Sequence, residues 1–177
     1  MHFLHAIRPS RVWLGLHLGR SERWARVFDD DRQGQQEKLL ILLAEDNRIN
    51  QRVTELIVKK LGYQIDIVAD GFEALAALER SAYSVVLMDV EMPKMDGMSA
   101  TRSIRAQYDD CQRPYIVALT ASEEREDCLS AGMDNFLAKP VRLAELGRVL
   151  SEATSTAAGW RARCGSPSGE VAARTAR

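Results

Sequence analysis

Cysteine is scarce in this chain, and no long apolar run is present. The 177 residues include 3 cysteines, which are widely spaced and form no Cys-x-x-Cys pair. An odd number at such spacing argues against a disulfide framework and against a zinc site, so a reducing cytoplasm is the expected location. No apolar stretch approaches the roughly 20 residues of a membrane-spanning helix, and Arg8 and Arg11 interrupt the one candidate signal region. We therefore expect a soluble protein without a membrane span.

The chain also lacks an excess of positive or negative charge. The chain has 24 Lys and Arg against 25 Asp and Glu, a net charge of −1, which gives no overall attraction to nucleic acid or membrane. The charges are unevenly placed, however. Residues 38–153 contain 19 acidic against 14 basic side chains, so their net charge is −5, whereas residues 1–28 and 154–177 are both basic. The middle of the chain is thus the acidic part.

Short apolar runs alternate with segments of helical periodicity from residue 39 onward, which is typical of a parallel α/β sheet. Five strands are predicted, over 39–44, 64–68, 85–88, 115–119 and 135–138. Val85 to Met88 is apolar on both faces, as expected of a parallel strand that helices cover on each side. Ile65-Asp66-Ile67 alternates, which favours an edge strand. The pattern predicts a (βα)₅ domain.

Helical spacing of apolar residues predicts a helix after each strand. Gly62 is placed to end the first of these helices, and Asp70-Gly71 to open the second. The apolar positions of the five helices are, in chain order, Ile49, Val53, Leu56, Ile57 and Leu61; Ala74, Leu75 and Leu78; Met98, Thr101, Ile104 and Tyr108; Cys128 and Leu129, a weak pair; and Leu143, Leu146, Val149 and Leu150.

Three regions follow from this pattern. Residues 38–153 form the predicted domain. Residues 1–37 keep no steady period and are interpreted as an N-terminal extension, either a linker remnant or a frayed helix, with a partner-binding helix as the alternative. Residues 154–177 are rich in small and basic residues and are predicted to be a disordered basic tail, too short for a helix-turn-helix domain. No direct nucleic-acid binding is therefore expected.

Polar residues occupy four different predicted strand ends. Glu45 and Asp46 follow the first strand, Asp89 the third, Thr120 the fourth and Lys139 the fifth. A single such residue is more often a helix cap or a turn residue, but ligands of open α/β sheets bind where the carboxyl ends of the strands meet. Carboxylates crowded there resist ionising unless a hard cation lies among them. We therefore expect Mg²⁺ at this edge of the sheet.

Several stretches resemble the receiver domain of two-component response regulators. They are AEDNRINQ over 44–51, LMDVEMP over 87–93, MDG over 95–97, ALTA over 118–121, AGMD over 131–134 and LAKP over 137–140. The resemblance covers 38–153 and is greatest to receivers of hybrid sensor histidine kinases. It implies a flavodoxin-like (βα)₅ fold, a doubly wound parallel five-stranded sheet with strand order 2-1-3-4-5.

The resemblance also implies a chemistry. Asp89 would take the phosphoryl group from a phosphohistidine on a sensor histidine kinase or a histidine phosphotransfer protein, and Lys139 would add a positive contact. Asp46 and Asp89 would bind Mg²⁺ directly, Glu45 through water, and the backbone carbonyl of Glu91 would complete the protein ligands.

A conformational switch is implied as well. Thr120 would donate its hydroxyl to the new phosphoryl oxygen, and Phe136 would rotate into the space that the Thr120 loop leaves. The alternative role for Phe136 is that of a core residue. The surface formed by residues 121–146 would then be the readout face.

Two further features come from the same resemblance. The Lys139-Pro140 peptide bond would be cis, which aims the lysine at the pocket. Glu91 and Ser122 occupy positions that vary in the family and tune the lifetime of the phosphoaspartate. Glu91 would obstruct an approaching water or would simply be a solvated loop charge, and the lifetime stays open.

Two other functions compete with phosphoacceptor signalling. One is a receiver-fold scaffold that acts by protein–protein interaction without phosphorylation, against which the acidic pocket argues. The other is a metal-dependent phosphatase, which would usually carry a second acid, an Asp, where this chain has Glu91.

No ATP-dependent kinase activity is expected of this chain alone. His2, His5 and His17 lie outside the domain, none precedes an acidic residue, and no glycine-rich nucleotide loop is present. We therefore predict a phosphorylated signalling module rather than an enzyme. Stand-alone regulator and fragment of a hybrid kinase both remain open, as does the oligomeric state.

Overall fold

The computed structural model describes residues 39–109, 112–121 and 124–164. Strands and helices alternate strictly through this part of the chain. In order they are β1 Leu40–Ala44, α2 Arg48–Lys60, β2 Gln64–Val68, α3 Gly71–Arg80, β3 Val85–Asp89, α4 Gly97–Gln107, β4 Tyr115–Thr120, α5 Arg125–Ser130, β5 Asn135–Ala138 and α6 Leu143–Cys164. The predictions for residues 1–37 and for Ser122 lie outside the described residues.

The five strands form one parallel sheet in the order β2-β1-β3-β4-β5. This confirms the flavodoxin-like (βα)₅ fold and its predicted strand order. β2 lies at an edge of the sheet, as its alternating sequence predicts. β3 lies at the centre and is buried along its whole length. The strand order reverses direction between β1 and β3, which is where open α/β sheets bind their ligands.

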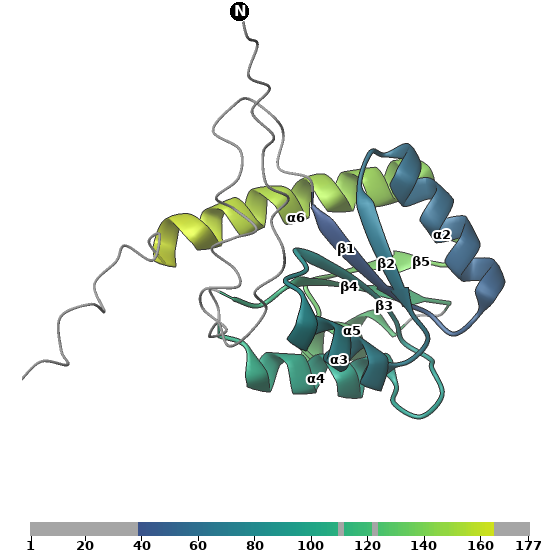
Figure 1. The fold of residues 1–177 in the computed structure, drawn as a ribbon, viewed down its shortest axis with the longest axis horizontal. Coiled ribbons are helices and arrows are strands. Elements are labelled where there is room, and N and C mark those ends of the chain that lie inside the picture. Colours follow the sequence, from purple (N-terminus) through teal and green to yellow (C-terminus); the bar gives the residue numbers. More distant parts are fainter. Residues whose placement is uncertain (1–38, 110–111, 122–123, 165–177) are drawn as a thin grey trace, which may run out of the picture.

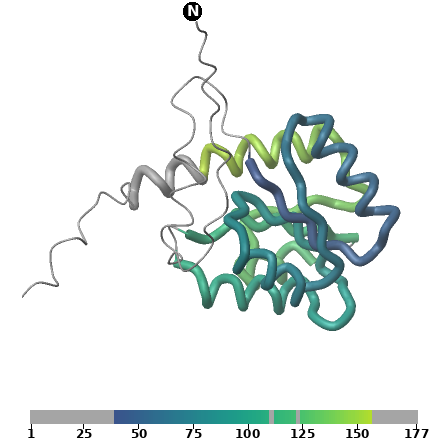
Figure 2. Tube along the Cα trace, in the orientation of Figure 1, coloured from purple at the N-terminus to yellow at the C-terminus, as the bar shows by residue number. Residues whose placement is uncertain are grey.

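Helices cover both faces of the sheet (Figures 1 and 2). α2 and α6 lie on one face, and α3, α4 and α5 lie on the other. Successive strand residues point to opposite faces, so Leu42 and Ala44 of β1 pack in the core layer beneath α3 and α4. Ile41 and Leu43 pack in the layer beneath α2 and α6. This double burial explains why β1 is apolar at every position.

Helix α2 forms where its periodicity predicts it, but only part of the predicted apolar stripe meets the core, namely Ile57 and Leu61. Ile49, Val53 and Leu56 are 74%, 42% and 52% exposed. Thr54 and Val58 are the buried residues of this helix instead. Apolar residues at spacings of four and three mark a helical face, yet they do not say whether that face meets the sheet or the solvent.

The ends of α2 follow from local sequence. The Asn47 side chain accepts hydrogen bonds from the backbone N–H groups of Ile49 and Asn50, so it caps the helix. At the other end Gly62 has φ +88°, and its N–H donates to the carbonyl of Lys59. This positive φ is the reason for glycine at the predicted stop.

Helix α6 runs to Cys164, past the boundary at residue 153 that the sequence predicts. The reason is local, because this stretch is rich in alanine, the best helix former. The hydroxyl of Thr154 also donates to the carbonyl of Leu150 one turn earlier, which fits a continuous helix. The domain boundaries at 38 and 153 stay predictions.

Candidate functional site

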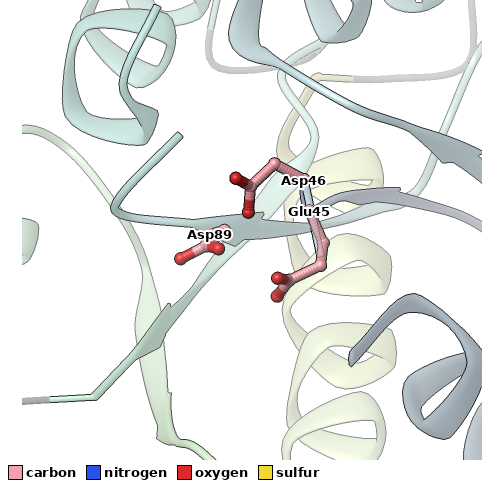
Figure 3. Close-up of side chains that lie close together, drawn as sticks. All are labelled: Glu45, Asp46 and Asp89. Atoms are coloured by element: carbon pink, nitrogen blue, oxygen red, sulfur yellow. The ribbon is translucent and has the colours of Figure 1, made fainter. Parts of the chain in front are cut away.

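Three carboxylates meet at the carboxyl edge of the sheet. Glu45 and Asp46 follow β1, and Asp89 ends β3, the strand that pairs with β1. One oxygen of each carboxylate lies within 4.8 Å of the others. Figure 3 shows the three carboxyl groups gathered in one place although they come from two strand ends. Glu45 and Asp89 are buried, and Asp46 is exposed.

The carboxylate of Glu45 is held in place from the first turn of α2. Its Oε1 accepts hydrogen bonds from the Asn50 side chain at 2.9 Å and from the Asn47 N–H at 3.3 Å. The Gln51 side chain donates to the backbone carbonyl of Glu45 at 2.6 Å. Sequence reasoning gave Asn50 and Gln51 no role, although both lie in the stretch that carries the family resemblance. These contacts fix the direction of the buried carboxylate.

Lys139 bridges the two buried carboxylates. Its Nζ lies 2.6 Å from Oδ2 of Asp89 and 2.9 Å from Oε2 of Glu45. Its backbone N–H donates to the carbonyl of Thr120 at 2.8 Å, and its peptide bond to Pro140 is cis. Burial alone would lower the pKa of Lys139, but the hydrogen bonds from Lys139 to Asp89 and Glu45 outweigh it and raise this pKa. The lysine therefore stays charged in the pocket.

The carboxyl group of Asp89 has a raised pKa. Burial is the largest cause, and the nearby charge of Glu45 adds to it. The hydrogen bond from Lys139 opposes both effects, as does the Glu91 N–H, which donates to Oδ1 at 3.2 Å. Two carboxylates and one ammonium in a partly closed pocket thus leave an excess of negative charge.

This donor set fits Mg²⁺. The ion prefers carboxylate and carbonyl oxygens and keeps several water molecules, so few protein ligands suffice. Asp46 is exposed, which leaves one side of the cluster open to water. Lys139 neutralises only part of the negative charge of three carboxylates, so a divalent cation would relieve the rest.

The other predicted site residues come from β4 and β5. Thr120 ends β4 and is 3% exposed, and its partner in the parallel register is Ala138. Phe136 lies in β5, is partly buried and packs beside the core layer. The guanidinium of Arg125 lies 3.8 Å from the centre of its ring. The fold therefore places Thr120 next to the strand that carries Phe136 and leads to Lys139.

A pocket of about 470 Å³ adjoins the cluster on the side of Asp46. It lies between α2, β2 and the start of α3, and both acidic and basic side chains line it. The lining residues are Asp46, Arg48, Gln51, Arg52, Glu55, Ile67, Val68, Ala69 and Glu73.

The comparisons with known proteins agree with this geometry. The family model described as the response regulator receiver domain matches residues 41–151. The chain belongs to this receiver family. Its relatives include the hybrid signal transduction protein dokA of Dictyostelium discoideum, which is 38% identical over 120 residues, 68% of this chain and 7% of that protein. The predicted family, including its likeness to receivers of hybrid histidine kinases, is thereby confirmed.

Two solved structures resemble this receiver domain in sequence and fold. One is the receiver domain of a sensor histidine kinase from Pseudomonas aeruginosa PAO1, with a magnesium ion coordinated in its active site cleft. It is 47% identical, has a TM-score of 0.61, and the match covers 67% of this chain and 98% of that one. The other contains the Saccharomyces cerevisiae histidine phosphotransfer protein Ypd1 with the receiver domain of its downstream response regulator Ssk1. It is 28% identical and has a TM-score of 0.60, and the match covers 65% of this chain and 88% of the matched chain in that structure.

The receiver domain corresponds to a small part of its curated relatives. The chain spans 15% or less of the length of the histidine kinases and hybrid proteins that it matches. Among the described residues, no helix combines the length and the apolar character that crossing a membrane would require. The cytoplasmic location expected from the sequence stays a prediction.

Proposed function

We propose that this receiver domain accepts a phosphoryl group on Asp89 from a phosphohistidine of a partner protein. The placement of Asp89 carries the proposal. Its carboxylate lies at the topological switch point of the sheet, 2.6 Å from Lys139 and beside two further carboxylates. A structural ion pair would need one carboxylate for one ammonium, whereas Lys139 contacts two carboxylates, and a third, Asp46, lies in the same cluster.

In the transfer, an oxygen of Asp89 forms a bond to phosphorus while the phosphorus–nitrogen bond of the phosphohistidine breaks, and the nitrogen keeps the electron pair. The Lys139 ammonium would contact the incoming phosphoryl oxygens, because it already lies beside Oδ2. When bound, Mg²⁺ supplies positive charge that offsets the charge on these oxygens. Asp46 and Asp89 would hold it directly, Glu45 through water, and the carbonyl of Glu91 would complete the set.

The new phosphoryl group would act as a switch. It adds roughly −1.5 to −2 charges at one point. Thr120, at the adjacent strand end, would donate its hydroxyl to a phosphoryl oxygen, and Phe136 would move inward behind it. That movement would have to rearrange the contact of the Phe136 ring with Arg125. The surface of residues 121–146 would then present the changed conformation to a target.

We further propose that the histidine-bearing partner docks on the exposed apolar residues of α2. Ile49, Val53 and Leu56 form a solvent-facing stripe on the helix that begins beside Asp46. Exposed apolar residues grouped on one helix face are typical of an interaction site. The related complex of a receiver domain with a histidine phosphotransfer protein supports a partner of this class.

The test is phosphorylation with acetyl phosphate and Mg²⁺, followed by intact-mass measurement. We expect one hydroxylamine-labile phosphoryl group per chain, lost in Asp89→Asn and retained in Asp127→Asn, which alters an exposed carboxylate on α5. Equal phosphorylation of Asp89→Asn would refute the assignment, and no phosphorylation of the wild-type chain would favour the scaffold function. Continuous turnover of a simple phosphate ester would favour the phosphatase function instead.

The docking face needs a separate test. Val53→Asp is expected to slow transfer from a phosphorylated histidine phosphotransfer protein at least tenfold, and to leave phosphorylation by acetyl phosphate unchanged. Lys60→Asp, at the far end of the same helix, is the control. An equal loss with both donors would mean that Val53 acts on the pocket rather than on a partner.

A further inference from the structure

An ion pair outside the acidic cluster ties down the loop that follows the phosphoacceptor strand. Lys94 lies in this loop, which joins β3 to α4, and its Nζ is 2.5 Å from Oδ2 of Asp70. The Asp70 side chain is only 2% exposed, whereas the Lys94 side chain is 66% exposed. The second oxygen of Asp70 accepts the N–H of Glu73 and so caps α3. Each oxygen of this buried carboxylate therefore has its own donor.

The backbone of Lys94 has an unusual conformation. Its φ is +65°, and among the described residues it is the only residue other than glycine with a positive φ. This region is uncommon for a residue with a long side chain, so surrounding contacts must hold it. The ion pair with Asp70 is such a contact. The pKa of Asp70 lies below its ordinary value, chiefly because of the hydrogen bond from Lys94.

Backbone contacts fasten the same loop at two more places. The Gly71 N–H donates to the Met95 carbonyl at 3.2 Å, beside the ion pair. A side chain at Gly71 would lie 2.8 Å from that carbonyl oxygen, so only glycine allows the approach. At the base of the loop the Gly97 N–H donates to the Val90 carbonyl at 3.0 Å.

The loop in turn contacts the phosphoacceptor. The N–H of Glu91, within this loop, donates to Oδ1 of Asp89 at 3.2 Å, while Lys139 holds Oδ2. The orientation of the Asp89 carboxylate thus depends on the conformation of residues 90–97. A change at the tip of the loop can reach the site through this hydrogen bond.

We propose that Lys94 is a positioning residue for the acidic site: by pairing with Asp70 it holds the β3–α4 loop in the conformation that orients Asp89 for Mg²⁺ and for the phosphoryl group. The proposal rests on the proposed function as far as the phosphoryl group is concerned. Lys94 does not itself contact the carboxylates at the site, so its effect is indirect. Gly71 lets the backbone at Met95 come close to the start of α3, and the ion pair between Lys94 and Asp70 holds the loop there.

The experiment measures Mg²⁺ binding by titration calorimetry together with the rate of phosphorylation by acetyl phosphate. Lys94→Ala is expected to weaken Mg²⁺ binding threefold to tenfold and to slow phosphorylation by a similar factor. Lys94→Arg should restore both to within twofold, because it keeps the charge. Lys94→Gly, which adopts a positive φ freely, should behave like Lys94→Ala if the ion pair is what matters. Lys60→Ala, at the end of α2, is the control.

A double-mutant cycle links the effect to Asp70. Asp70→Asn keeps an oxygen for the helix cap and removes the charge, so it should weaken Mg²⁺ binding as Lys94→Ala does. The double variant should be no weaker than either single variant, because both remove the same interaction. Losses that multiply in the double variant, or wild-type Mg²⁺ binding in a folded Lys94→Ala, would overturn the proposal.

The two proposals fail in different ways. If the wild-type chain takes no phosphoryl group but Mg²⁺ binding still depends on Lys94, the phosphoacceptor function falls and the positioning role stands. If the wild-type chain is phosphorylated while every folded Lys94 variant binds Mg²⁺ and reacts as the wild type does, only the positioning role falls.

Discussion

The ammonium of Lys139 lies 2.6 Å from Oδ2 of Asp89, although β4 separates the strands from which the two residues come. Lys139 follows β5, and its N–H is bonded to the carbonyl of Thr120 at the end of β4. The side chain therefore reaches across one strand end to the next. This places a fixed positive charge beside a buried carboxylate and makes the lysine the strongest candidate for a test by substitution.

Lys139→Met is expected to slow phosphorylation of Asp89 by acetyl phosphate by about 10²-fold, the usual effect of removing one preorganised charge contact. Methionine keeps the length of the side chain and removes the charge. The rate is followed by intact mass at saturating Mg²⁺, with Lys60→Met as the control. A rate within twofold of the wild type would show that Lys139 serves only the folded structure.

The start of α4 offers a test of close packing against the site. A Cβ atom added at Gly97 would lie 2.0 Å from the backbone oxygen of Asp89, so the helix would have to move away from the end of β3. Gly97→Ala is expected to lower the free energy of unfolding by about 3 kcal/mol or more, as overpacking does. Urea denaturation measures this change.

Gly147 provides the matched control. An added Cβ there would lie 3.5 Å from Leu61, which is ordinary contact, and the residue is inside helix α6. Gly147→Ala is expected to raise the free energy of unfolding by about 0.5–1 kcal/mol, since alanine is the better helix former. Equal effects at the two glycines would mean that helix α4 can shift freely relative to Asp89.

Strand sequence predicts this fold well because both faces of a parallel sheet are buried. A run such as Val85 to Met88 contains no polar residue, so the sequence marks it as a buried strand and places Asp89 directly at its end. The strand ends then bring Asp46 and Asp89 together through topology alone. Most of the acidic cluster could therefore be predicted without the structure.

Three-dimensional contacts account for what the sequence could not predict. The apolar spacing of α2 predicts a helix, but only the packing of Val58 against the sheet shows that Leu56 faces solvent. The ion pair of Lys94 with Asp70 joins residues from different loops, and no local pattern marks it. The contact between Asn50 and Glu45 depends on how α2 is set against β1.

Tyr83 provides a test of stability away from the acidic cluster, because it lies just before the start of β3 whereas Asp89 ends that strand. Its hydroxyl donates to Asp66 at 2.7 Å, and burial together with this bond raises the pKa of Tyr83 to about 12. Stabilisation by the neutral hydroxyl is thus fully present below pH 10 and is lost as the pH rises towards 12. Tyr83→Phe should cost about 1 kcal/mol at pH 7.

The pH dependence separates this hydrogen bond from simple packing. Between about pH 10 and 12, from the pKa of an unfolded tyrosine to the raised pKa of Tyr83, the free energy of unfolding should fall more steeply for the wild type than for Tyr83→Phe. Urea denaturation at several pH values measures the two slopes, with Tyr63→Phe as the control. Parallel slopes would contradict the raised pKa.

Asn50 should matter for metal binding although it is not a predicted ligand. Its side chain donates to Oε1 of Glu45, whose other oxygen faces Lys139. Without this donor the buried carboxylate can rotate, since only the longer bond from the Asn47 N–H still holds Oε1. A hydrogen bond to a charged group is worth about 1.5 kcal/mol or more, so Asn50→Ala is expected to weaken Mg²⁺ binding about tenfold.

Titration calorimetry with Mg²⁺ measures this effect, and urea denaturation in the absence of Mg²⁺ shows whether the fold has changed. Gln64→Ala, which alters an exposed amide on the edge strand β2, is the control and should bind Mg²⁺ as the wild type does. If Asn50→Ala loses stability but keeps its Mg²⁺ affinity, then the amide supports only the start of α2, and Glu45 is held well enough by Lys139 and the backbone.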